Sequence, residues 1–274
     1  MKLSIITINY NNKAGLQKTI DSVISQTFKD FEWIIIDGGS TDGSKDLIEK
    51  HSSYITYWVS EPDKGIYNAM NKGIMVAKGE YLYFLNSGDA LYSHNIIENL
   101  FNNNLYGDIV YGNAIFINKD KTQLLVKPNK NISLSFFVSG HVINHQSTFI
   151  RKKLFDSCLY NENLQLVSDW EFEIKQAILG KTYQYIDKII VLYDYTGLTS
   201  KPSDLLSKER KSVINNISWA IKKVMDELFL LRKFAGNEYV KIIYNYSEKG
   251  YIFKKIINFT IQILKAIDFC TRKS

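Results

Sequence analysis

Three aspartates follow three predicted strands of the chain: Asp37, Asp63 and Asp89. Before Asp37 the sequence runs Phe-Glu-Trp-Ile-Ile-Ile, and two glycines come after it, which is typical of a buried parallel strand that ends abruptly. Because the carboxyl ends of parallel strands meet at the edge where open α/β sheets bind ligands, we expect the three carboxylates to share a cleft.

The surroundings of two of these acids indicate what the cleft would bind. Asp63 precedes a predicted helix N-terminus and has Lys64 beside it, which suits an anionic ligand. Asp89 ends the polar turn Asn-Ser-Gly-Asp, and Mg²⁺ or Mn²⁺ uses such a carboxylate beside diphosphate oxygens. Simpler explanations stay open: Asp37 as a helix cap, Asp63 as an ordinary loop acid, and Asp89 as the cap of a helix beginning near Ser93.

The elements that must position these acids alternate between strand and helix. This order implies an α/β fold with a mostly parallel sheet and right-handed crossovers. We predict strands at 3–9, 32–37, 55–59 and 80–85 and helices at 13–26, 44–50 and 65–77. Further on, we expect a hairpin of 108–117 and 122–127, a helix at 169–179, a strand at 183–194, and a mostly helical chain after Pro202.

The composition of the chain is typical of a globular protein rather than of a secreted or membrane-spanning one. The 274 residues are 45% hydrophobic and 23% charged, as in a globular protein with a sizeable core. The two cysteines, Cys158 and Cys270, match no metal or redox spacing, which favours a reducing cytosol. Residues 1–12 are too short and polar for a signal peptide, and no run of ~20 apolar residues predicts a membrane-spanning helix.

The net charge of +6 belongs to the C-terminal part of the chain. Residues 201–274 carry 15 basic and 7 acidic residues, and the remainder carries 34 − 15 = 19 basic and 28 − 7 = 21 acidic residues. This distribution argues against nucleic-acid binding by the body of the protein and for an anionic surface near the tail.

Five stretches of the sequence, taken together, form a specific pattern. They are Leu3–Asn11, Ser25–Glu32, Ile36–Ser44, Glu61–Gly73 and Gly79–Asp89. In combination they resemble the inverting family 2 glycosyltransferases of the GT-A fold, a nucleotide-diphospho-sugar transferase fold, over roughly residues 2–200. Within that family the chain looks similar to bacterial enzymes that build cell-surface polysaccharide.

The resemblance implies a role for each matching residue on the donor side. Tyr10 would pack against the nucleotide base, Asp37 would accept a hydrogen bond from the base, and Asp63 would contact the nucleoside or its sugar, with Lys64 beside it. Asp89 matches the final acid of the family's DXD-like motif, which binds the divalent metal, Mg²⁺ or Mn²⁺. Relatives often carry Asp-Ala-Asp-Asp where this chain has a single acid, so metal affinity would depend on the nucleotide's own phosphates.

The resemblance also implies a catalytic base in the segment Leu-Val-Ser-Asp169-Trp-Glu-Phe-Glu. Inversion at the anomeric carbon needs a carboxylate on the face opposite the leaving group, and Asp169 matches that position. His145, in a segment that resembles the acceptor side, would lie near this base. Two structural alternatives stay open: Asp169 as a helix cap, and His145 as a core histidine.

The C-terminal region forms a predicted helical extension, residues 201–274, beyond a catalytic domain at 1–200. Within it, residues 252–269 place nearly all of their polar side chains on one arc, as in a basic amphipathic helix. This helix would lie in a membrane interface or pack on the domain, and the sequence leaves both open. The expected location is the cytoplasm, with peripheral contact at the inner face of the cell membrane.

These observations predict a metal-dependent inverting transferase. It would move a sugar from a nucleotide-diphosphate donor, with a UDP-sugar favoured, to a hydroxyl of a saccharide or lipid-linked acceptor. Two rivals stay open: a degenerate nucleotide-sugar-binding or scaffold subunit, and a sugar nucleotidyltransferase. The nucleotidyltransferase needs a glycine-rich basic loop after the first strand, whereas this chain has Asn-Tyr-Asn-Asn-Lys there.

Overall fold

The computed structural model describes residues 1–195 and 204–217. Its strands are β1 (Leu3–Asn9), β2 (Phe31–Asp37), β3 (Tyr57–Ser60), β4 (Tyr81–Phe84), β5 (Ala90–Leu91), β6 (Ile109–Ile117), β7 (Gln123–Val126), β8 (Thr148–Arg151) and β9 (Tyr183–Asp194). Its α-helices are α1 (Lys13–Ile24), α2 (Ser44–Lys50), α3 (Ile66–Val76), α4 (Ile96–Phe101), α5 (Leu134–Val138) and α6 (Ser168–Ile178), and residues 204–217 are also helical. Short 3₁₀ turns occupy Ser52–Tyr54, His145–Ser147 and Lys152–Leu154.

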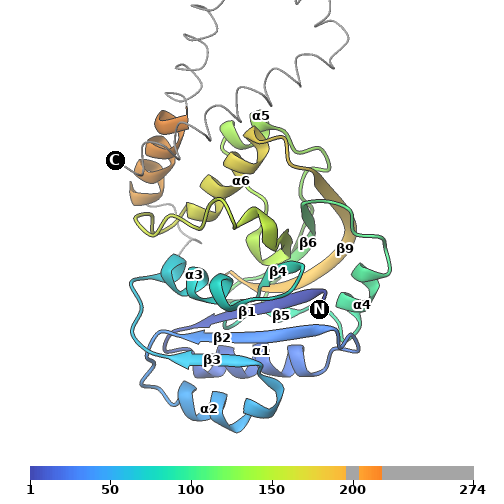
Figure 1. The fold of residues 1–274 in the computed structure, drawn as a ribbon, viewed down its shortest axis with the longest axis vertical. Helices are drawn as coiled ribbons and strands as arrows, with labels where there is room; N and C mark the ends of the chain where they lie inside the picture. Colours follow the sequence, from blue (N-terminus) through green and yellow to red (C-terminus); the bar gives the residue numbers. More distant parts are fainter. Residues whose placement is uncertain (196–203, 218–274) are drawn as a thin grey trace, which may run out of the picture. The chain divides into compact units, whose positions relative to one another are not determined.

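One curled sheet organises the described residues (Figure 1). Its strand order is β3-β2-β1-β4-β8-β6-β9-β5, and β7 pairs with β6. The four strands from β3 to β4 are mutually parallel, β6 and β9 are parallel, and β8, β7 and β5 pair antiparallel with their neighbours. The predicted α/β fold with a mostly parallel sheet is therefore confirmed.

Alternation along the strands divides the core between the two faces of the sheet. On one face, the odd-numbered residues of β1 and β2 pack with α1 and α2 in the cluster that contains Ile5, Trp33 and Ile35. On the other face, Ile6 and Ile34 pack with α3 and α6. Strands β1, β2 and β4 are buried on both faces, which is why their sequences read as nearly continuous apolar runs.

The predicted boundaries agree closely with the structure where the apolar pattern is long. The helix at 44–50 and the strand at 3–9 are observed at those limits, and the predicted hairpin is the β6–β7 pair. The third strand begins later than predicted, at Tyr57, because a 3₁₀ turn precedes it at Ser52–Tyr54. The sequence predicted neither β5 nor β8, each of which is four residues or shorter.

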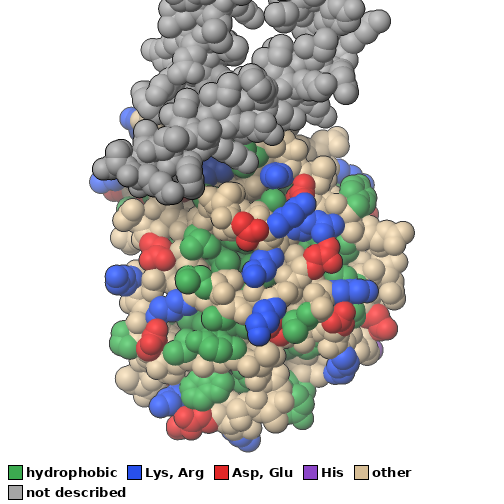
Figure 2. Space-filling view, in the orientation of Figure 1, with side chains coloured by type: hydrophobic (Ala, Val, Ile, Leu, Met, Phe, Trp, Pro, Cys, Tyr) green, Lys and Arg blue, Asp and Glu red, His purple; other side chains and the backbone are tan. Residues whose placement is uncertain are grey.

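The chain divides into two compact units, Met1–Glu209 and Arg210–Ser274. The predicted boundary at residue 200 and the amphipathic helix at 252–269 fall within or beside segments outside the described residues, and both stay predictions. No helix within 1–195 or 204–217 is long and apolar enough to cross a membrane. Figure 2 shows acidic and basic side chains interspersed over one face of these residues, in line with the nearly balanced charge of residues 1–200.

Candidate active site

The carboxylate of Asp37 joins the ends of three parallel strands. In the register of the sheet, Asn9 of β1, Asp37 of β2 and Ser60 of β3 lie side by side. Asn9 Nδ2 and Ser40 Oγ each donate to Asp37 Oδ1 at 2.6 Å, and Ser60 Oγ donates to Oδ2 at 2.6 Å. Burial raises the pKa of Asp37, but these hydrogen bonds outweigh it and hold the pKa below its ordinary value, so the group is ionised.

The helix-cap explanation for Asp37 is wrong. Helix α2 begins after Gly43, which adopts the left-handed conformation and makes no side-chain cap bond. The side chain of Asp37 is fully buried, and its carboxylate accepts hydrogen bonds from the neighbouring strand ends and from the amide and hydroxyl of Ser40. Its predicted contact with a nucleotide base stays a prediction.

Next to this carboxylate network, the side chains of Tyr10 and Asp63 both lie close to Gly38, the residue that follows Asp37. A Cβ atom on Gly38 would lie 2.6 Å from Asp63 Oδ2 and 3.1 Å from Tyr10 Cδ2, so a larger residue there would displace the Asp63 carboxylate. Asp63 Oδ1 accepts a hydrogen bond from the Gly65 amide at 2.8 Å, and Tyr10 is 67% exposed. The structure therefore brings the predicted Tyr10, Asp37 and Asp63 together, with the exposed Lys64 next in the chain.

Asp89 occupies the turn after β4, where it meets an acid that sequence reasoning missed. Asp89 is 3% exposed, and its Oδ1 accepts a hydrogen bond from the Asp194 amide at the end of β9, at 2.9 Å. Burial raises the pKa of Asp89 to about 8, with the Asp194 amide and Lys18 lowering it and the Asp194 carboxylate raising it. Asp89 does not cap α4, because that helix begins at Ile96 after Asn95.

The donor atoms at this turn fit a divalent cation bound together with a diphosphate. Two carboxylates, Asp89 and Asp194, approach each other there, and a Cβ on Gly88 would lie 3.5 Å from Asp194 Oδ2. The amide oxygen of Asn86, at the start of the turn, is buried and accepts no hydrogen bond from the described residues. Among those residues no group of three or more His, Cys, Asp or Glu side chains is arranged to hold a metal, and Mg²⁺ is usually bound through one or two carboxylates together with waters and substrate phosphates.

Asp169 lies in the first turn of α6 and contacts the helix that follows Asp63. Tyr67, in the first turn of α3, donates its hydroxyl to Asp169 Oδ1 at 2.8 Å. Burial and the charge of Asp169 raise the pKa of the Tyr67 hydroxyl well above its ordinary value, so it remains a donor. The helix-cap explanation is wrong, because the N-cap of α6 is Val167 and makes no side-chain cap bond.

The other acids of α6 have different surroundings. Glu171 pairs with Lys175 at 3.1 Å one turn along the helix. Glu173 is buried, and burial together with the charge of Asp169 raises its pKa well above its ordinary value, which favours the neutral form. Of the three acids, only Asp169 is both partly exposed and hydrogen-bonded to Tyr67 of α3, the helix that follows Asp63.

His145 lies close to Asp169 but is a buried residue. It is 6% exposed, its Nε2 is 2.8 Å from the Tyr160 hydroxyl, and its ring packs against Phe84 of β4. Burial lowers the pKa of His145, and the Asp169 carboxylate acts in the opposite direction. The structural alternative for His145 is therefore supported by its contacts, and a direct role toward an acceptor stays a prediction.

Glu209 is a further residue that the sequence did not indicate, and it binds the backbone just before α6. Its two carboxylate oxygens accept the backbone amides of Gln165 and Leu166 at 2.8 and 2.9 Å. The sequence predicts this glutamate in the helical extension at 201–274. Each of three residues makes a hydrogen bond to a part of the chain at least 40 residues away: Glu209, Asp194 and Tyr67. No local sequence motif indicates such contacts.

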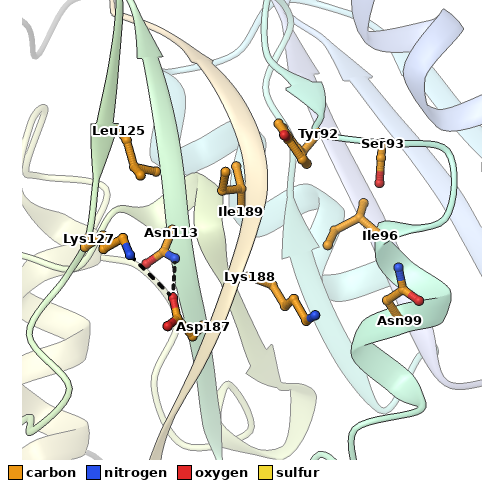
Figure 3. Close-up of a pocket in the computed structure, with 10 residues that line it drawn as sticks. All are labelled: Tyr92, Ser93, Ile96, Asn99, Asn113, Leu125, Lys127, Asp187, Lys188 and Ile189. Carbon is orange, nitrogen blue, oxygen red and sulfur yellow. Dashed lines mark hydrogen bonds and ion pairs between the residues drawn. The ribbon is translucent and has the colours of Figure 1, made fainter.

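A cavity of about 320 Å³ on another part of the sheet contains none of the predicted site residues (Figure 3). In it Asp187 of β9 accepts a hydrogen bond from Asn113 Nδ2 at 2.9 Å and lies 3.9 Å from Lys127 Nζ. Its lining also includes Tyr92 and Leu125. The predicted cleft is therefore distinct from this cavity.

The sequence matches the family model described as Glycosyl transferase family 2 over residues 4–158. The chain belongs to glycosyltransferase family 2. It is 31% identical over 187 residues to a PGL/p-HBAD biosynthesis glycosyltransferase of Mycobacterium bovis, a match that covers 63% of this chain and 68% of that protein.

Solved structures with the same fold include glycosyltransferases bound to nucleotide sugars. S. aureus TarS 1-349 in complex with UDP-GlcNAc superposes with a TM-score of 0.63 at 17% identity, covering 95% of this chain and 79% of that chain. Mannosyltransferase PcManGT from Pyrobaculum calidifontis, in complex with GDP-Man and Mn²⁺, gives a TM-score of 0.55 at 15% identity and covers 70% and 56%. These likenesses confirm the GT-A fold of this family 2 glycosyltransferase.

The buried His145 makes stability depend on pH in a defined window. The folded protein binds a proton there less readily than the unfolded chain, whose histidine titrates near about 6.5. The stability due to neutral His145 is present above that pH and is lost as the pH falls below it.

We expect the urea concentration at the unfolding midpoint to decrease between pH 7 and pH 5, and to decrease less steeply in His145→Gln. His94→Gln, at an exposed histidine, should keep the wild-type slope; parallel slopes in His145→Gln and wild type would contradict the assignment.

Proposed function

We propose that this family 2 glycosyltransferase is metal-dependent and inverting, and that it moves a sugar from a nucleotide-diphosphate donor to a hydroxyl of a saccharide or lipid-linked acceptor. A UDP-sugar is the favoured donor and surface polysaccharide biosynthesis the favoured context. One observation carries the proposal: the Tyr67–Asp169 hydrogen bond joins a candidate base to the helix that starts at the Asp63 loop, across 102 residues.

On the donor side, the exposed ring of Tyr10 would pack on the base beside the Asp37 network. Asp63 and Lys64 would contact the nucleoside and its phosphates. The relation of Tyr10, Gly38 and Asp63 supports this assignment, because the side chains of Tyr10 and Asp63 both lie close to Gly38, the residue that follows Asp37. TarS and PcManGT, which share the fold, are bound to UDP-GlcNAc and GDP-Man in their structures, which supports a nucleotide-sugar donor here.

A divalent metal, Mg²⁺ or Mn²⁺, would be held by Asp89, with Asp194 beside it. When bound it would stabilise the negative charge that develops on the departing diphosphate. The pair of nearby carboxylates supports this proposal, since a bound cation would offset the cost of placing Asp89 in a buried position next to a second acid. The Mn²⁺ in the PcManGT complex is a further support.

Asp169 would act as the general base. The acceptor hydroxyl oxygen attacks the anomeric carbon, its proton passes to the Asp169 carboxylate, and the bond to the nucleoside diphosphate breaks with its electron pair on the leaving group. Tyr67 would keep the carboxylate oriented by its hydrogen bond. Attack opposite the leaving group inverts the anomeric configuration.

Replacement of the base tests this mechanism most specifically. We expect Asp169→Asn to lower transfer by about 10²–10⁴-fold while leaving donor binding near normal, because asparagine still accepts the Tyr67 bond but takes no proton. Glu171→Gln, on the same helix but paired with Lys175, is the matched control and should keep its activity. The product's anomeric configuration, read from NMR coupling constants, should be opposite to that of the donor.

Two results would contradict the proposal. A product with retained configuration would exclude single displacement. Full transfer activity in Asp169→Asn would remove the assigned base and leave Glu173 as the next acid to replace.

A lipid-linked acceptor would bring the enzyme to the cytoplasmic leaflet, and residues 252–269 are the segment suited to that contact. The segment lies outside the described residues, and the support is its sequence: three lysines, Lys254, Lys255 and Lys265, on one polar arc. The proposed location is therefore the cytoplasm with peripheral contact at the inner face of the membrane.

Charge removal in the full chain tests the membrane contact. Replacing Lys254, Lys255 and Lys265 by Gln should weaken sedimentation with anionic vesicles by on the order of 100-fold, since each basic residue near the surface contributes about 1 kcal/mol. Added salt should have the same effect. Lys119→Gln with Lys121→Gln, in the exposed turn between β6 and β7, is the control. Equal vesicle binding by the tail variant and wild type would refute the contact.

A further inference from the structure

Helix α1 holds the turn that carries Asp89, although the sequence indicated no role for this helix in the site. Asn12, the N-cap of α1, donates from Nδ2 to the Ser87 carbonyl at 3.0 Å and accepts the Ser87 hydroxyl on its own carbonyl at 3.1 Å. Lys18 Nζ donates to the Gly88 carbonyl at 2.8 Å. Thr19 Oγ1 donates to the Asp89 carbonyl at 2.7 Å.

Thr19 binds the backbone of two consecutive residues of the turn, Gly88 and Asp89, with one hydroxyl. Besides donating to the Asp89 carbonyl, its Oγ1 accepts the Gly88 amide at 3.1 Å. The residue is fully buried, so water does not replace these bonds if the hydroxyl is lost. A hydroxyl is the one small side-chain group that donates and accepts at the same place, and only serine and threonine carry it at this length.

The turn has one internal backbone hydrogen bond, from the Asp89 amide to the Asn86 carbonyl at 3.0 Å, and its other bonds come from outside. Gly88 has a φ of +108°, a conformation that glycine adopts readily and other residues rarely do. Asp89 is also the single acid of the turn, whereas Asn86 stands at its start. A carboxylate that acts with few neighbours must be positioned accurately to bind a cation.

We propose that Thr19, with Lys18 beside it, is a positioning residue for Asp89: its hydroxyl fixes the backbone of Gly88 and Asp89 so that the carboxylate is directed to a divalent cation and the donor diphosphate. The inference rests on the proposed function. Lys18 contributes a second bond, to the Gly88 carbonyl, from the adjacent position of the same helix. Together the two residues add bonds from the helix to those that the turn receives from the sheet, where the Ser87 amide donates to the Ile8 carbonyl of β1 at 3.0 Å and the Asp194 amide of β9 donates to Asp89 Oδ1.

The test measures Mn²⁺ binding to the full chain in the presence of UDP, by the loss of the free Mn²⁺ signal in electron paramagnetic resonance. We expect Thr19→Val, which keeps the shape but removes the hydroxyl, to raise the Mn²⁺ dissociation constant about 10–100-fold, as for other groups that orient metal ligands. Thr19→Ser should stay close to wild type. Asp89→Asn is the benchmark for complete loss of the carboxylate ligand.

Thr7→Val is the matched control. Thr7 is also a fully buried threonine, and its hydroxyl accepts the Trp33 indole N–H at 3.0 Å, in the core below the site. The two valine variants thus each remove one buried hydroxyl, and only Thr19→Val should weaken Mn²⁺ binding. Hydrogen exchange of the amides at 86–90, measured without metal, should quicken in Thr19→Val and not in Thr7→Val. If Thr19→Val fails to fold, the same exchange measurement on Lys18→Met, a partly exposed position, decides the question.

The possible results separate the inference from the proposed function. Unchanged Mn²⁺ affinity and unchanged exchange in Thr19→Val would overturn the positioning role while leaving a metal-dependent transferase intact. A wild-type protein that binds UDP but no Mn²⁺ would overturn the metal dependence, and the inference with it. Weakened binding in Thr19→Val that Thr19→Ser restores would support the positioning role.

Discussion

A single buried carboxylate, Asp37, holds the ends of β1, β2 and β3 in register. Asn9, Ser40 and Ser60 all donate to it, so the three strand ends and the following turn form one hydrogen-bonded unit. Such a charge is stable in a buried place only when hydrogen bonds surround it, and its lowered pKa reflects that condition. The positions of Tyr10 and Asp63 depend on this unit, because both side chains lie close to Gly38, the residue that follows Asp37.

The curl of the sheet brings distant acids to the same edge. Strand β5, directly after Asp89, pairs with the last residues of β9, and this pairing delivers Asp194 to Asp89. On the other face of the parallel strands, α3 and α6 pack together, and their first turns meet at Tyr67 and Asp169. Two contacts, each between parts of the chain about 100 residues apart, thus bring Asp194 to Asp89 and Asp169 to the helix that follows Asp63.

The strands and side chains that the sequence predicted correctly are those marked by a local pattern of apolar and polar residues. Continuous apolar runs identified β1 and β2, and the residues that follow them identified Asp37 as a side chain of the sheet edge. Asp194, Glu209 and Thr19 were not found, because each acts through a contact set by the curl of the sheet or by helix packing. Thr19 in particular has the sequence context of an ordinary amphipathic helix, and only the structure shows its hydroxyl on the Asp89 turn. His145 was found through the family resemblance, yet its buried ring shows why a motif does not tell a contact residue from a packed one.

A crystal structure of the full chain with UDP and Mn²⁺, with anomalous diffraction to locate the metal, would show whether the strand edge is the active site. We expect a manganese peak at the carboxylate of Asp89, with the diphosphate beside it and the uracil ring against Tyr10 next to the Asp37 network. A manganese ion and nucleotide bound elsewhere, for example in the cavity lined by Asn113 and Asp187, would contradict the assignment of the strand edge as the active site.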